Sequence, residues 1–176
     1  MAAPGENLRI NPDRLWDTLM DMAADSEGRH LFAGWCAKAG CKMGVDSMGN
    51  MFARREGSDS DALPVYVGSH LDTQPTGGKY DGVLGVLGGL EVIRSLNDLG
   101  IKTKHPIVVT NWTNEEGTRF APAMLASGVF AGMHTEDWAK DRVDADGKRF
   151  GDELRRIDWE GDEKVGERKM HAFFEL

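Results

Sequence analysis

Long apolar runs are missing from this chain of 176 residues. Its most apolar window, residues 82–90, is interrupted by Glu91 and falls far short of the roughly 20 residues that a membrane-spanning helix needs. Residues 1–9 contain no basic stretch followed by an apolar core, which a secretory signal requires. We therefore expect a cytoplasmic protein that has no membrane partner.

Cysteine is scarce as well, since the sequence contains two. Cys36 and Cys41 lie five residues apart, and this spacing matches neither a zinc-binding clip nor a disulfide framework. Buried thiols in a reducing compartment fit the pattern. We therefore do not expect structural zinc or disulfide bonds to hold this protein together.

Positive charge is scarce relative to negative charge. The chain has 21 Lys and Arg residues against 29 Asp and Glu residues, which gives a net charge of −8. The basic residues are scattered, and the densest group is at 102–105. Nucleic acids and anionic membranes bind surfaces on which Lys and Arg are clustered. The composition therefore argues against a nucleic-acid partner and against a membrane surface.

The sequence does contain the pattern of one α/β domain. An Asn-Pro start followed by apolar residues at helical spacing predicts a helix over 11–24, with a break at 25–28. The other predicted elements are a helix over 29–39, a hairpin of strands 41–45 and 51–55, a strand over 63–69, a helix from 80 or 81 to 99, a strand over 107–113, a short helix over 152–156 and a buried strand over 170–176.

Residues 63–113 form the centre of this pattern, a β-α-β unit. The run 107–113 is apolar without alternation, as expected for a central parallel strand that is covered on both faces. The helix before it carries Gly85, Gly88 and Gly89, which we expect to allow close approach to the sheet. The predicted fold class is therefore α/β, with a mixed, largely parallel sheet flanked by helices.

Residues with metal-binding or proton-transfer chemistry gather in the two loops that follow these strands. They are His70, Asp72 and Asp81 in segment 68–82, and Glu115 and Glu116 in segment 114–120. Ligands of these types suit a hard or borderline divalent metal. A lone histidine or glutamate pair is usually structural, and a Gly-rich loop can instead bind phosphate, but segment 68–82 has neither P-loop nor dinucleotide spacing. Their joint occurrence at the carboxyl ends of two strands favours a metal site.

The roles open to these residues are partly separable. His70 and Asp72 lie on the same side of an extended segment, so Asp72 can accept the second ring N–H of a metal-bound His70. Asp81 offers two oxygens, which suits a ligand that bridges two metals. Of Glu115 and Glu116, one can bind a metal while the other takes a proton from water. The residues alone leave open which glutamate does which.

Taken together, segments 68–82 and 114–120 closely resemble the amidase branch of the dizinc M20 peptidase superfamily. This branch contains N-carbamoyl-L-amino-acid hydrolases, β-ureidopropionases and allantoate amidohydrolases. Segment 170–176 is similar to the family's strand that leads into a His-Ile-Glu-Gln-Gly motif. The short step from His70 to Asp81 is typical of this branch, because the gap is longer in true peptidases. The resemblance implies the N-terminal half of a dizinc aminopeptidase-like catalytic domain.

By this resemblance, His70 binds one metal, Asp81 bridges both metals and Glu116 binds the other. Glu115 is then the general base, and Asp72 orients His70. The implied cofactors are two divalent ions, with Zn²⁺ first and Mn²⁺, Co²⁺ or Ni²⁺ as alternatives. The implied activity is hydrolysis of the carbamoyl C–N bond of a small N-carbamoyl-L-amino acid or ureido substrate, which yields amino acid, carbon dioxide and ammonia.

The resemblance also implies parts that these residues do not contain. In the family, a histidine ligand follows directly after the position of Leu176. Later come a lid domain that mediates homodimerisation, another histidine ligand, and Asn and Arg residues that bind the substrate carboxylate. His171 lies in the corresponding strand but too early, so we do not assign it as a ligand. We therefore expect residues 1–176 to be a partial catalytic domain.

Two alternatives stay open on the sequence. Allantoate amidohydrolase belongs to the same branch and differs in substrate-pocket residues outside these segments. A truncated product without catalysis, either a remnant or a binding module, belongs to another functional class. A polar C-terminal tail would favour that second reading, whereas this sequence stops inside an apolar strand.

We predict that the purified 176-residue chain alone releases no ammonia from N-carbamoyl amino acids. The physical reason is that three ligand residues without their two histidine partners bind metal weakly. Ammonia release measured with and without added divalent metal tests this prediction. Detectable, metal-dependent release by this chain would contradict it.

Overall fold

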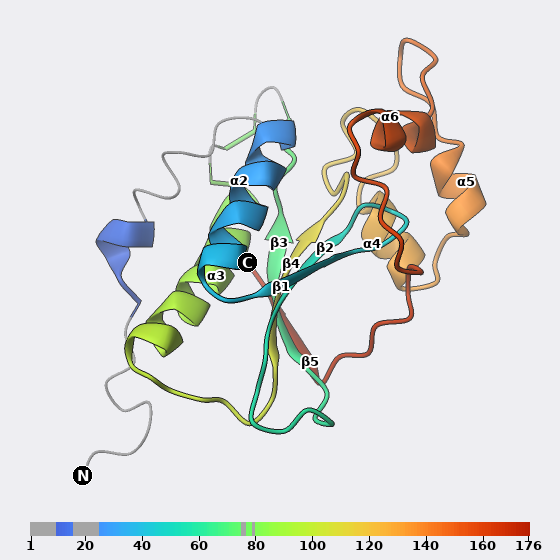
Figure 1. Cartoon of the computed structure of the whole chain (residues 1–176). Helices are drawn as coiled ribbons and strands as arrows, with labels where there is room; N and C mark the ends of the chain where they lie inside the picture. Colours follow the sequence, from blue (N-terminus) through green and yellow to red (C-terminus); the bar gives the residue numbers. More distant parts are fainter. Residues whose placement is uncertain (1–9, 16–24, 75–76, 79) are drawn as a thin grey trace.

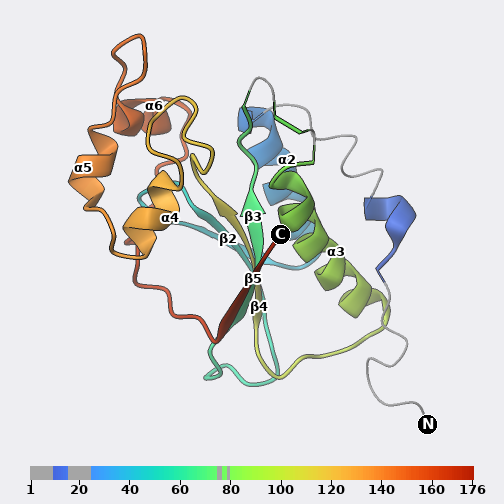
Figure 2. The ribbon, with the colours of Figure 1, turned by 180° about the vertical axis from the view of Figure 1, so that it is seen from behind.

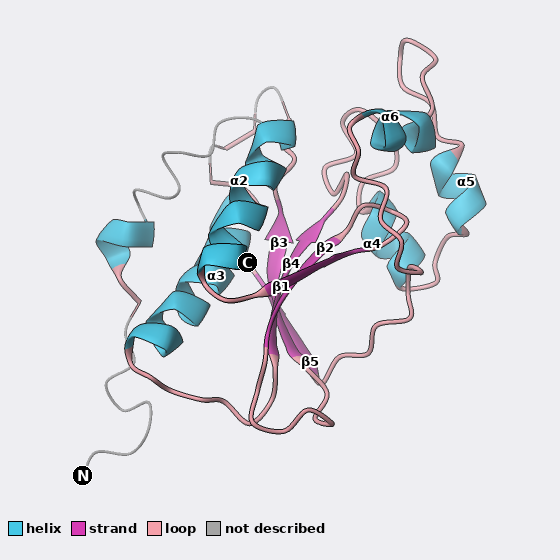
Figure 3. Cartoon of the chain, in the orientation of Figure 1, coloured by secondary structure: helices cyan, strands magenta, loops and turns pink. Residues whose placement is uncertain are grey.

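The computed structural model describes residues 10–15, 25–74, 77–78 and 80–176. Its elements (Figure 3) are α2 (Asp25–Lys38), β1 (Lys42–Val45), β2 (Met51–Arg55), β3 (Val65–His70), α3 (Val83–Asp98), β4 (Ile107–Trp112), α4 (Leu125–Phe130), α5 (Glu136–Lys140), α6 (Phe150–Arg156) and β5 (Ala172–Glu175). Within the described part of the chain, no helix combines the length and apolar character needed to cross a membrane.

The strands of the described chain form one mixed sheet in the order β1-β2-β4-β3-β5. β1 and β2 are the predicted antiparallel hairpin, and Gly49 in their turn has a φ of 79°. β2 pairs antiparallel with β4, whereas β3 runs parallel to both β4 and β5. A parallel pair needs a crossover connection, and α3 provides it between β3 and β4. The predicted α/β class with a mixed sheet is confirmed.

Helices cover both faces of this sheet (Figures 1 and 2). α2 and α3 lie side by side on one face, and α4, α5 and α6 gather on the other side. Val109 of β4 belongs to the large core cluster that includes Leu87 of α3. Its neighbour Val108 belongs to the second cluster, because successive side chains of a strand point to opposite faces. Phe130 of α4 packs against that second cluster, with its ring centroid 5.1 Å from that of Trp112.

Two of the three glycines expected to allow close packing of α3 do so. A Cβ added at Gly85 would lie 2.8 Å from Cβ of Ser69, and one at Gly89 would lie 2.9 Å from Cγ1 of Val67. A side chain at either position would therefore push α3 off β3. Gly88 corrects the expectation, because a Cβ there would meet no atom within 4 Å. It lies on the side of the helix that turns away from the sheet.

The N-terminal helices agree only in part with the sequence-based expectation. Asn11 caps a helical turn at residues 12–15, and its side-chain oxygen accepts a hydrogen bond from the Arg14 N–H at 3.0 Å. The rest of that predicted helix, 16–24, lies outside the described residues. The next helix begins at Asp25, so the predicted break at 25–28 is wrong. Asp, Ser and Glu residues in a first turn favour a helix start, which explains the difference.

The segment after β4 contains more helix than its polar composition predicted. α6 agrees with the short helix expected over 152–156. α4 and α5 were not predicted. The Thr135 side chain caps α5 by accepting a hydrogen bond from the Trp138 N–H at 3.3 Å. Helices this short contain too few apolar residues to show helical periodicity in the sequence.

The strand predicted over 170–176 exists as β5, but it is not buried. Phe174 and Leu176 are 62% and 81% exposed. Among the described residues, β5 pairs with β3 alone and therefore forms an edge of the sheet. Phe173 packs inward, with its ring 5.8 Å from that of Trp112. The apolar composition of β5 predicted a strand correctly, but it could not predict an edge position.

A buried carboxylate ties the first described turn to α3. The Glu91 side chain is completely buried, and it accepts hydrogen bonds from Nε and Nη2 of Arg14 at 2.9 and 2.7 Å. It also accepts one from the backbone N–H of Asn11 at 3.1 Å. Removing one partner of such a pair leaves the other charge poorly compensated. Glu91 is therefore the buried anchor of residues 11–14, alongside the exposed ion pair of Arg14 with Asp98 at 2.9 Å.

Glu91→Gln is predicted to lower the free energy of unfolding by about 1–3 kcal/mol. The reason is that a glutamine amide carries no charge to pair with Arg14 and has one oxygen, not two, that can accept hydrogen bonds. Glu56→Gln is the matched control. Glu56 pairs with Arg54, but its side chain is 50% exposed, so we expect a change within about 0.5 kcal/mol. Urea unfolding followed by circular dichroism measures both. Equal effects of the two substitutions would contradict the prediction.

Candidate metal centre

The parallel register of β3 and β4 brings two loops to the same edge of the sheet. His70, the last residue of β3, is level with Trp112, the last residue of β4. The loops carrying Asp72 and residues 115–116 therefore leave the sheet side by side, where open α/β sheets bind ligands. Asn114 has a φ of 53°, a left-handed conformation that asparagine tolerates, and it turns the chain after β4.

His70, Asp81 and Glu116 meet at this edge. Each offers one ligand atom, and the three atoms lie within 4.8 Å of one another. Oε1 of Glu116 is buried and has no hydrogen-bond partner among the described residues. A buried carboxylate oxygen without a donor is costly unless a cation lies beside it. The structure thus brings the three predicted ligands together, and the donor set fits a divalent metal.

The His70 ring is held with one nitrogen directed at these carboxylates. Its Nδ1 lies 2.9 Å from the backbone carbonyl oxygen of Asp72, which can only accept, so Nδ1 carries the proton. The lone pair of Nε2 then faces Oε2 of Glu115 at 3.3 Å and Oδ1 of Asp81 at 3.8 Å. A neutral imidazole with this tautomer is the form that binds a metal.

Asp72 supports both loops with different atoms. Its backbone carbonyl orients His70, whereas the nearest carboxylate oxygen is 3.8 Å from Nδ1. The sequence had suggested the carboxylate for this role. That carboxylate instead accepts hydrogen bonds from the backbone N–H groups of Glu115 and Glu116, each at 3.1 Å. Asp72 therefore links the loop after β3 to the loop after β4.

Glu115 lies beside the three ligand residues without belonging to their cluster. Burial is the main cause that raises the pKa of its carboxyl group, against the opposing effect of His70. Nearby carboxylates raise this pKa further, and they belong to Asp72, Glu116 and Asp81. A second acidic group close to a metal centre is the arrangement that proton transfer requires.

One acidic residue near the centre escaped the sequence analysis. Glu175 of β5 is level with Gly68 of β3, which places it near the same edge. Burial raises the pKa of Glu175, and the charge of Glu115 raises it further. No local motif marks Glu175, because only the pairing of β5 with β3 brings it there. His171 precedes the residue of β5 that pairs with the start of β3, so it lies toward the opposite end of that strand from His70.

Gly82 allows the chain to pass against the His70 ring before α3 begins. Its φ is 67°, and a Cβ at this position would overlap the ring atoms of His70. Both the backbone conformation and the lack of space therefore require glycine here. The same turn carries Asp81, so Gly82 positions one ligand while it leaves room for another.

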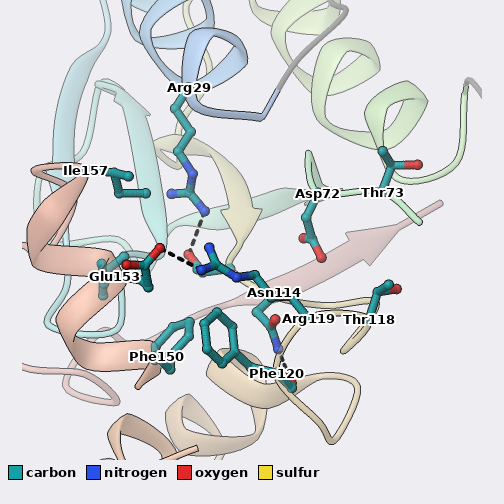
Figure 4. Close-up of a pocket in the computed structure, with 12 residues that line it drawn as sticks. Arg29, Asp72, Thr73, Asn114, Thr118, Arg119, Phe120, Phe150, Glu153 and Ile157 are labelled. Atoms are coloured by element: carbon teal, nitrogen blue, oxygen red, sulfur yellow. Dashed lines mark hydrogen bonds and ion pairs between the residues drawn. The ribbon is translucent and has the colours of Figure 1, made fainter. Parts of the chain in front are cut away.

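A cavity of about 360 Å³ adjoins the centre. Asp72 and Asn114 line it on the side of the centre, and side chains of α6 line the opposite side (Figure 4). The fold and the donor set thus define an α/β protein with a candidate divalent-metal centre at the carboxyl ends of parallel strands.

Comparison with known proteins agrees with this class. The model of peptidase family M20/M25/M40 matches residues 66–176, and the chain belongs to this family. The chain is 68% identical to an N-carbamoyl-L-amino-acid amidohydrolase of Rhizobium meliloti, over 99% of the chain and 46% of that protein. It is 43% identical to a ureidoglycolate hydrolase of Oryza sativa subsp. japonica, over 61% of the chain and 22% of that protein.

Solved structures lead to the same branch of the family. The crystal structure of an amidase of the hydantoinase/carbamoylase family from Burkholderia multivorans superposes with a TM-score of 0.93 and 52% identity. The match covers 96% of this chain and 45% of that one. The resemblance to the amidase branch is confirmed. The chain spans less than half the length of these curated relatives.

Gly82→Ala is predicted to lower the affinity for Zn²⁺ at least roughly 10-fold, because the new methyl group displaces a ligand ring. Gly100→Ala is the matched control. Its φ of 62° imposes similar backbone strain, but a Cβ there meets no atom within 4 Å. Titration calorimetry with Zn²⁺ compares the two variants with the unchanged protein. Similar affinities for both variants would show that the His70 ring does not bind the ion.

Proposed function

We propose that these residues form part of a metal-dependent amidohydrolase that cleaves the carbamoyl C–N bond of N-carbamoyl-L-amino acids. One water is consumed, and the products are the amino acid, carbon dioxide and ammonia. The proposal rests on the convergence of His70, Asp81 and Glu116, with Glu115 beside them. It is supported by 68% identity to an N-carbamoyl-L-amino-acid amidohydrolase.

His70, Asp81 and Glu116 would hold the metal. Asp81 has two oxygens, so we assign it to both ions of a two-metal centre. One imidazole nitrogen with carboxylate oxygens suits Zn²⁺ first, and Mn²⁺, Co²⁺ or Ni²⁺ as alternatives. When bound, such metals lower the pKa of water and polarise a carbonyl group.

We assign Glu115 to proton transfer. Its carboxylate lies 3.3 Å from Nε2 of His70 and outside the three-residue cluster, so it stays free to accept a proton from water. It can return that proton to the leaving nitrogen, which must depart as an amine. Asp72 supports this role by holding the backbone N–H of Glu115 at 3.1 Å. Asp72 is therefore a positioning residue for both His70 and Glu115.

The remaining parts of this proposal concern the whole protein. Residues 1–176 form a partial catalytic domain, and a lid domain, two further histidine ligands and the groups that bind the substrate carboxylate come from elsewhere in a longer chain. That protein is a homodimer through its lid domain and acts in the cytoplasm on a small molecule. It has no nucleic-acid or membrane partner. Coverage of less than half of each relative supports the partial domain, and the net charge of −8 of these residues argues against a nucleic-acid surface on them.

A ureido acid such as allantoate is the alternative substrate within the same reaction class. The 43% identity to a ureidoglycolate hydrolase favours it, but this identity extends over 61% of the chain, against 68% identity over 99% for the carbamoyl-amino-acid enzyme. Ammonia release from both kinds of substrate by the full-length protein separates the two. A non-catalytic remnant would release ammonia from neither.

In the full-length protein, Glu115→Gln is predicted to lower kcat at least roughly 100-fold, because an amide accepts no proton. Its metal content should stay unchanged. Glu116→Gln is predicted to lose metal and activity together. Glu167→Gln, whose side chain is 66% exposed, is the control and should change neither. Metal analysis and ammonia release are measured on the same samples. Loss of metal in Glu115→Gln would reverse the assignment of the two glutamates.

A further inference from the structure

The cavity beside the candidate metal centre offers a specific place for part of the substrate. It lies between α6, the loop after β4 and the end of the loop after β3 (Figure 4). Its volume of about 360 Å³ lies within the range of pockets that bind small molecules. Asp72 and Asn114 line it, and Asp72 also holds the backbone of Glu115 and Glu116. The cavity therefore shares a wall with the reacting end of the site.

Apolar side chains make the far wall of this cavity. The rings of Phe120 and Phe150 meet edge to face with their centroids 5.4 Å apart. Leu154 of the same wall lies about one turn further along the chain from Phe150, and Ile157 lies about one turn beyond Leu154. These side chains belong to the described core or pack against it, yet they border open space. Such a surface favours an apolar occupant over water.

Both arginines that line the cavity already donate hydrogen bonds to protein groups. Nη2 of Arg119 donates to Oε2 of Glu153 at 2.6 Å. Nη1 of Arg29 donates to the carbonyl of Gly49 at 2.9 Å, and its Nη2 donates to Oγ1 of Thr113 at 3.1 Å. An acidic substituent entering the cavity would compete with Glu153 for Arg119. The interactions therefore disfavour a charged occupant.

We propose that this cavity binds the side chain on the α-carbon of the substrate and selects apolar N-carbamoyl-L-amino acids. An apolar cavity of about 150 Å³ is known to hold a benzene ring, so this larger one admits side chains of roughly four to seven carbons. This inference rests on the proposed function. Ile157 lines the cavity and is only half-buried, so it tolerates substitution better than its buried neighbours Phe150 and Leu154.

The test uses the full-length protein with its metal restored. Values of kcat/KM are measured for the N-carbamoyl derivatives of glycine, aspartate, leucine and phenylalanine. The values of kcat/KM for the leucine and phenylalanine derivatives should exceed that for the glycine derivative at least roughly 10-fold, as expected when several methylene groups enter an apolar pocket. The value of kcat/KM for the aspartate derivative should be no higher than that for the glycine derivative.

Ile157→Trp fills the cavity and should lower kcat/KM for the phenylalanine derivative at least roughly 10-fold, while the glycine derivative stays within about 3-fold. Leu31→Trp is the control, because it places the same ring on the surface of α2, where Leu31 is 40% exposed. It should leave the ratio of kcat/KM for the phenylalanine derivative to that for the glycine derivative unchanged. If Ile157→Trp does not fold, as judged by its thermal midpoint, Ile157→Ala replaces it. Ile157→Ala should lower kcat/KM for the leucine derivative and not for the glycine derivative, because it removes contacts between the cavity wall and the substrate side chain.

Two results would overturn the inference while the proposed function stands. One is equal kcat/KM for the glycine and phenylalanine derivatives. The other is a preference for apolar side chains that neither Ile157 variant changes. Hydrolysis of none of the four derivatives, glycine included, would overturn the proposed function and this inference with it.

Discussion

Asp72 is the residue on which the geometry of the site depends. Its backbone carbonyl sets the tautomer of His70, and its carboxylate holds the backbone of Glu115 and Glu116. The second contact exists because β3 and β4 end level with each other, so that the two loops leave the sheet as neighbours. A single residue thus fixes an imidazole and the backbone of two glutamates relative to one another, which is the pre-organisation that a metal centre requires.

The charge balance of the site follows from the same geometry. Four carboxylates and an imidazole lone pair converge in a place where burial raises the pKa of Glu115. Like charges at this distance destabilise the protein unless a cation lies among them. The neighbouring cavity has a different character, because Arg119 pairs with Glu153 there and Phe120, Phe150, Leu154 and Ile157 provide an apolar wall. The site therefore divides into an acidic half, to which we assign the chemistry, and a more apolar half, to which we assign the selection of the substrate side chain.

Much of the fold was predictable because its determinants are local. Asn11 caps a helix, Gly49 turns a hairpin, and the apolar periodicity before Gly100 defines α3. The predictions that were wrong or missing concern position within the whole. Gly88 faces away from the sheet, β5 lies at an edge, and α5 is too short to show periodicity. None of these features is encoded in a few neighbouring residues.

The sequence alone determined the candidate ligands, since His70, Asp81 and the pair Glu115-Glu116 stand in motifs whose residue types and spacing are specific, and the family resemblance predicted Glu116 rather than Glu115 as the ligand. It also determined the β-α-β unit that carries them, because backbone sterics and apolar periodicity act over short distances. Only the tertiary structure decided that the Asp72 carboxylate holds the backbone of Glu115 and Glu116, that Glu175 approaches the site and that a cavity lies beside it. Those outcomes depend on strand register and packing between distant segments, which sum many weak contacts that no short motif specifies.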